Sequence, residues 1–88
     1  MSQGLIEYGK RALRILGQDV DENVQLDDIV HKLENLSGNY NASSSEQEIV
    51  ETMAILINCF KTRDCVPLNI ELYLGNLEDQ VSFSEHWD

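Results

Sequence analysis

The side chains able to hold a transition metal or act as a nucleophile are Cys59, Cys65, His31 and His86. Their spacings do not match a zinc module, in which close Cys or His pairs form two corners of a tetrahedron. The sequence has no glycine-rich phosphate loop and no nucleophile elbow. A chain of 88 residues also leaves little room for a substrate pocket and its supporting residues. The sequence therefore predicts no enzyme, no metal site and no cofactor.

The stretch 19–30 partly matches a calcium-binding EF-hand loop, because oxygen-bearing side chains recur at alternate positions from Asp19 to Asn23. Val24 stands where that loop requires glycine for its sharp turn. Val30 stands where it requires a glutamate that chelates the ion with both oxygens. Since the two most demanding positions differ, we do not expect specific calcium binding.

Charge is the strongest compositional feature of the chain. The sequence has sixteen acidic and six basic residues, which gives a net charge of −10. Nucleic acids and anionic membranes bind through clustered Lys and Arg, so neither is an expected partner. The same charge favours electrostatically steered association with a basic protein.

The acidity is concentrated in two blocks. Residues 19–36 and residues 66–88 each carry a net charge of −5, whereas residues 1–18 carry +2 and residues 37–65 carry −2. Such an uneven distribution indicates a recognition surface more than a device for solubility alone. The acidic residues predicted to bind a partner are Asp19, Asp21, Glu22, Asp27, Asp28, Glu78, Asp79 and Glu85, with Tyr73 and Trp87 as aromatic anchors.

These features predict a small acidic protein-binding module. The first hypothesis is an inhibitor, an immunity protein or an antitoxin that covers a basic nucleic-acid-binding or nuclease site on its partner protein. The alternative is a helical structural or regulatory subunit that acts through oligomerisation, including a possible homodimer. The two differ in the oligomeric state expected of the isolated protein.

The remaining residues must form the scaffold, and its centre is the stretch 43–63. Apolar residues recur there at helical spacing, and residues 53–57 are apolar on every side, so we expect this helix to be buried. Ser45 and Glu48 fit a capping box at its start. The residues expected to point inward are Ile49, Val50, Met53, Ala54, Leu56, Ile57 and Phe60.

Two further helices are predicted before this one, over residues 5–16 and 25–36. The first has an apolar face and ends at Gly17, which suits a left-handed C-terminal stop. The second has a regular apolar stripe, and His31 lies beside that stripe as a boundary residue. The apolar positions are Leu5, Tyr8, Ala12, Ile15 and Leu16 in the first helix and Leu26, Ile29, Val30, Leu33 and Leu36 in the second.

The segment after Pro67 supports two structures. Apolar residues at helical spacing from Val66 to Val81 favour a helix, with Pro67 as its first residue. The alternation of residues 68–74, followed by Gly75, favours instead a β-hairpin over residues 68–84. The helical stripe covers more residues, so the predicted fold is an all-α bundle of three to four helices in a single domain, residues 1–88, with an α+β fold as the alternative.

Cysteine content and the N-terminal sequence bear on the compartment. Two cysteines do not make a disulfide scaffold, and the first residues lack the long apolar core of a signal peptide. No stretch is long and apolar enough to cross a membrane. We therefore expect a cytoplasmic protein with both thiols free.

Overall fold

A computed structural model describes residues 2–40 and 46–85, and in these ranges the chain is built from four helices without a strand. They are α1 (Ser2–Ile15), α2 (Leu26–Gly38), α3 (Gln47–Thr62) and α4 (Pro67–Glu85). The all-α prediction is confirmed. The alternative hairpin over residues 68–84 is wrong, because one continuous helix covers that segment and Pro67 is its first residue.

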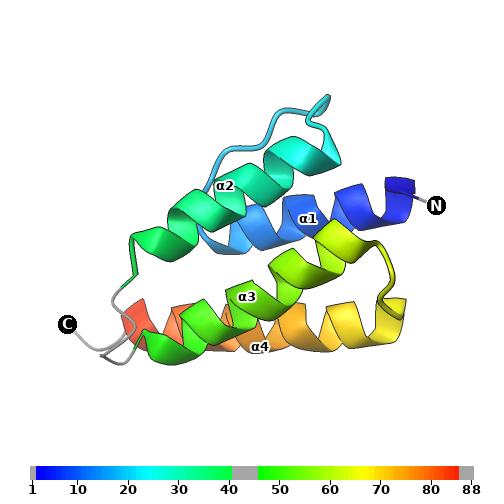
Figure 1. Cartoon of the computed structure of the whole chain (residues 1–88). Helices are drawn as coiled ribbons and strands as arrows, with labels where there is room; N and C mark the ends of the chain where they lie inside the picture. Colours follow the sequence, from blue (N-terminus) through cyan, green and yellow to red (C-terminus); the bar gives the residue numbers. More distant parts are fainter. Residues whose placement is uncertain (1, 41–45, 86–88) are drawn as a thin grey trace.

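The helices form a four-cornered bundle in which α1 packs on α2 and α4, and α3 packs on the same two helices. Figure 1 shows that α1, α2 and α4 run in the same direction and that α3 runs against them. The direction of α2 requires the connection between α1 and α2 to return along the bundle. Helices α2 and α4 consequently occupy opposite corners, which decides how the two acidic blocks are placed.

Buried apolar residues from all four helices make one core. Phe60, Met53 and Leu56 of α3 are fully buried at its centre, and Thr52 beside them is 7% exposed. The Thr52 hydroxyl donates a hydrogen bond to Oε1 of Gln80 on α4 over 2.9 Å. The apolar core residues are Ala12, Leu13, Leu26, Ile29, Val30, Leu33, Ile49, Met53, Leu56, Cys59, Phe60, Ile70, Leu74 and Leu77.

The helix ends follow the predicted chemistry in part. Gly17 has a φ of 81°, and backbone hydrogen bonds from Gly17 to Arg14 and from Gln18 to Leu13 close the end of α1. This confirms the left-handed stop. Helix α3 begins one residue after Glu46, which makes no side-chain capping bond. Ser45 of the predicted capping box lies outside the described residues.

The prediction that residues 53–57 are buried on every side is wrong. Ala54 is exposed and Ile55 is 42% exposed, because α3 contacts the bundle with only part of its circumference. The face that turns inward carries Ile49, Met53 and Phe60, as expected. In α1 the burial is centred differently from the prediction: Leu13, which was not assigned to the core, is fully buried, because α1 packs on two neighbours.

Helix α4 is apolar on two sides. Ile70, Leu74 and Leu77 are fully buried, which agrees with the helical stripe. Leu68 and Leu72, which supported the strand alternation, are 74% and 61% exposed. The apolar residues that made the sequence ambiguous are therefore the ones that this helix leaves on the surface.

Cys59 and Cys65 are joined by a disulfide, with 5.4 Å between their Cα atoms. The expectation of two free thiols is corrected. Cys59 lies in the last turn of α3, and a left-handed residue, Arg63 with a φ of 55°, turns the chain back toward it. The bond thus closes the connection between α3 and α4. Among the described residues no helix is both long and apolar enough to span a bilayer.

Candidate protein-binding surfaces

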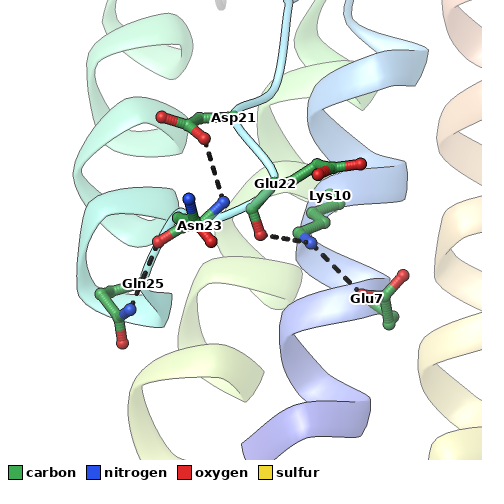
Figure 2. A network of polar contacts seen from close by, with 6 residues as sticks. All are labelled: Glu7, Lys10, Asp21, Glu22, Asn23 and Gln25. Carbon is green, nitrogen blue, oxygen red and sulfur yellow. Dashed lines mark hydrogen bonds and ion pairs between the residues drawn. The ribbon is translucent and has the colours of Figure 1, made fainter.

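The connection between α1 and α2 is held against α1 by Lys10, whose side chain is 11% exposed. Figure 2 shows Lys10 between the loop and α1. Its Nζ donates to the backbone carbonyl oxygen of Glu22 over 3.1 Å and to Oε2 of Glu7 over 3.4 Å. Because the carbonyl belongs to the backbone, the bond fixes the course of the loop while the Glu22 side chain stays in solvent. Lys10 therefore positions part of the first acidic block.

The rest of this loop is shaped by short local bonds. The backbone N–H of Asn23 donates to Oδ1 of Asp21 over 3.0 Å, and the Gln25 side-chain amide donates to the carbonyl oxygen of Asn23 over 3.3 Å. An Asx turn of this kind satisfies the backbone without a ligand. Asp19, Asp21 and Glu22 are all exposed in this loop.

The acidic side of α2 is partly neutralised by the end of α3. Arg63 Nη2 lies 3.3 Å from Asp27 Oδ1, and Lys61 Nζ lies 2.8 Å from Glu34 Oε2. His31, predicted as a boundary residue, is 78% exposed, with its Nδ1 4.0 Å from the other Glu34 oxygen. Of the five predicted acids in this block, Asp27 is in an ion pair and Asp21 accepts a backbone hydrogen bond.

Glu34 is the carboxyl whose electrostatic environment is clearly altered. The hydrogen bond from Lys61 lowers the pKa of Glu34 below its usual value. Partial desolvation opposes this effect, whereas the charge of Lys61, and that of His31 when it is protonated, add to it. The pair keeps Glu34 ionised to a lower pH than an unpaired glutamate and links the surfaces of α2 and α3.

The second acidic block lies on α4. Glu78 and Asp79 are exposed, while Tyr73 is half-buried and packs against the core. Glu85 is the last residue of α4, and its side chain lies outside the described part, as does Trp87. The structure therefore describes two of the three predicted acids of this block and one of the two predicted aromatic anchors.

The two predicted acidic blocks do not form one surface. Helices α2 and α4 stand at opposite corners of the bundle, with α1 and α3 between them. In the described ranges, four bases of these intervening helices and their ends are in ion pairs: Lys10 with Glu7, Arg11 with Glu71 at 4.0 Å, and Lys61 and Arg63 as described above. Arg14 of α1 is exposed. Each block is therefore a separate candidate surface.

Sequence reasoning missed a third group, which we call the α3–α4 outer face. It comprises Ile55, Leu68 and Leu72, with the exposed acids Glu48, Glu51 and Asp79 at its edge. The signal was present in the sequence: Leu68 and Leu72 are four residues apart, outside the stripe of Ile70, Leu74 and Leu77. The same residues also fit the alternation of a strand, which hides the second apolar side of the helix.

The described residues contain no group of three or more His, Cys, Asp or Glu side chains arranged to hold a metal ion. In the same ranges, each buried side-chain nitrogen or oxygen has a hydrogen-bond partner. The candidate binding features of the described residues are thus the carboxylates and the exposed apolar side chains on the surface. Comparison with known proteins finds no matching family model, no matching curated protein and no matching solved structure.

Proposed function

We propose that this chain is an acidic protein-binding module whose partner presents a basic surface. Inhibitors, immunity proteins and antitoxins that cover a nucleic-acid-binding or nuclease site act in this way, and we place the chain in that class. The partner binds through complementary charge, without direct contact between this chain and nucleic acid or membrane.

The observation that supports the proposal is the surplus of unpaired carboxylates on the surface. Within the described ranges, no base lies within ion-pair distance of Asp19, Asp28, Glu51, Glu78 or Asp79. Isolated surface ion pairs contribute little to stability, so these charges are not needed for the fold. A field of one sign on both sides of the bundle raises the rate of encounter with a cationic partner.

The test is affinity capture with the immobilised protein from an extract of the source organism, followed by elution with increasing salt and mass spectrometry. Two variants neutralise three charges each on opposite sides. One is Asp19→Asn, Glu22→Gln and Asp28→Asn, and the other is Glu51→Gln, Glu78→Gln and Asp79→Asn. We expect a basic protein to be retained, to elute with salt and to be lost with one variant. Retention that neither salt nor either variant changes contradicts the proposal.

A second candidate function, self-association as a helical subunit, is favoured by the exposure of Leu68 and Leu72. Light scattering coupled to size-exclusion chromatography separates the two candidate functions, since a monomer across the concentration range supports the inhibitor class.

The proposed location of the protein is the cytoplasm, and the state of the Cys59–Cys65 bond provides a test of that location. In the reducing cytoplasm this bond should be open, so alkylation in intact cells should label both thiols. Protection of both thiols instead indicates an oxidising compartment, in which the bond persists.

A further inference from the structure

We infer that the α3–α4 outer face is the docking site for a cationic amphipathic helix of the partner protein. This inference rests on the proposed function, since it names the surface and the chemistry through which a basic partner is bound.

The apolar part of the site is a stripe on α4. Leu68 and Leu72 are separated by four residues, and Asp79 follows Leu72 by seven, so all three share one side of the helix. That side is opposite the one that buries Ile70 and Leu74. Exposures of 74% and 61% leave most of both leucine residues available for burial by a partner.

Helix α3 adds the third apolar residue of the face. The Thr52–Gln80 hydrogen bond joins α3 to the antiparallel α4, and the Cys59–Cys65 bond ties α3 to the connection that leads into α4. Ile55 lies between Thr52 and Cys59 on the same side of α3, and its 42% exposure places it at the outer edge of the seam. The apolar residues of this face are about one helical turn apart. A third helix can pack on them, because its own side chains recur at one-turn spacing.

Charge determines which helix fits. The edge of the face carries Glu48, Glu51 and Asp79, and no lysine or arginine occurs in the sequence after Arg63. Lys61 and Arg63 at the end of α3 point to the other side, where they pair with α2. The complement of this face is a helix with an apolar stripe flanked by Lys or Arg.

The same charges argue against other occupants. A second copy bound on this face brings carboxylates of both copies together, and like charges in apposition oppose association. An anionic membrane surface is repelled for the same reason. A cationic helix therefore satisfies both the apolar stripe and its acidic edge.

The probe for the test is an 18-residue amphipathic helix made only of leucine and lysine. Two control peptides are the same sequence with glutamate for lysine and a peptide of the same composition with its leucines scattered around the helix. Binding is followed by fluorescence anisotropy of the labelled peptide, and the site is mapped by backbone amide shifts of the ¹⁵N-labelled protein.

We expect the leucine–lysine helix to bind and to shift amides around Ile55, Leu68 and Leu72, with both control peptides at least tenfold weaker. Leu68→Ser with Leu72→Ser should weaken binding at least tenfold, and Glu51→Gln with Asp79→Asn severalfold. Asp19→Asn with Asp28→Asn is the control that removes the same number of charges elsewhere. Because the leucines are exposed, circular dichroism of the variants should be unchanged.

Four results overturn the inference. Shifts confined to the α1–α2 loop reject the docking site and leave the proposed function standing, as does equal binding of the scattered peptide. If neither of the two lysine-containing peptides binds at low salt, the docking site and the proposed function are both rejected. A dimer that is lost in the Leu68→Ser, Leu72→Ser variant assigns the face to a second copy.

Discussion

A β-carbon placed on Gly9 of α1 would lie 2.8 Å from Cγ2 of Ile29 on α2, closer than real β-carbons approach a neighbour. The contacted atom is a branch at the β-carbon of a fully buried side chain, so it cannot swing away. The parallel pair α1–α2 therefore depends on the absence of a side chain at this position.

Gly9→Ala should destabilise the protein by about 1–3 kcal/mol, because the extra methyl overpacks the contact with Ile29. Gly75→Ala is the matched control, since no heavy atom lies within 4 Å of its added β-carbon. It should instead stabilise α4 by roughly 0.5–1 kcal/mol through helix propensity. Urea unfolding followed by circular dichroism measures both. An equal change in the free energy of unfolding for the two variants would contradict the close contact between Gly9 and Ile29.

Thr52→Val should cost about 0.5–1.5 kcal/mol, because it removes the buried hydroxyl that donates to Gln80 and leaves the amide oxygen without that bond. A double-mutant cycle with Gln80→Ala should give a coupling energy of that order. Thr62→Val is the control, since that hydroxyl is exposed and lies 3.5 Å from its acceptor. A coupling energy near zero would mean that Thr52 and Gln80 do not align α3 with α4.

Reduction of the Cys59–Cys65 bond should lower the free energy of unfolding by about 2 kcal/mol, the chain-entropy value for so short a closed loop. Cys65→Ser should have the stability of the reduced protein and should not respond to reductant. The measurement is urea unfolding with and without reductant, together with mass spectrometry after alkylation. Two alkylated thiols in purified protein exposed to air would contradict the bond.

Lys61→Gln should raise the pKa of Glu34 toward its ordinary value, because the Lys61 hydrogen bond is the main cause of the depression. Arg63→Gln is the control, since Arg63 pairs with Asp27. A carboxyl titration by ¹³C NMR gives the pKa in each variant. Because the folded pKa lies below the unfolded one, the pair stabilises the fold above the unfolded pKa. That contribution disappears as the pH falls through the folded pKa, and Lys61→Gln should remove it.

Local sequence patterns were sufficient to predict that the chain forms helices and where several of them begin or end. Gly17 and Pro67 mark real boundaries, and the stripe from Leu26 to Leu33 is buried as the spacing predicts. The hairpin alternative and the burial assigned to Ile55 share one cause. Hydrophobicity along a chain indicates how many apolar residues there are, and only packing decides which of them are covered.

The candidate surfaces were less predictable because they depend on helix directions. Nothing in the acidic stretch around Asp19 indicates that the loop doubles back along α1, where a backbone carbonyl meets Lys10. That path puts α2 and α4 at opposite corners and separates blocks that looked equivalent in sequence. The Cys59–Cys65 bond was likewise hidden, since six residues of separation become 5.4 Å between Cα atoms only after the turn at Arg63.

The directions of the four helices also polarise the molecule. Each helix carries about half a positive charge at its beginning and half a negative charge at its end. The opposed pair α2 and α3 cancel, whereas α1 and α4 point the same way and add. The end of the bundle where α1 and α4 terminate is therefore the more negative pole, beyond what the carboxylates supply. Close to that end of the bundle, the helix ends therefore add to the attraction that the carboxylates exert on a cationic partner.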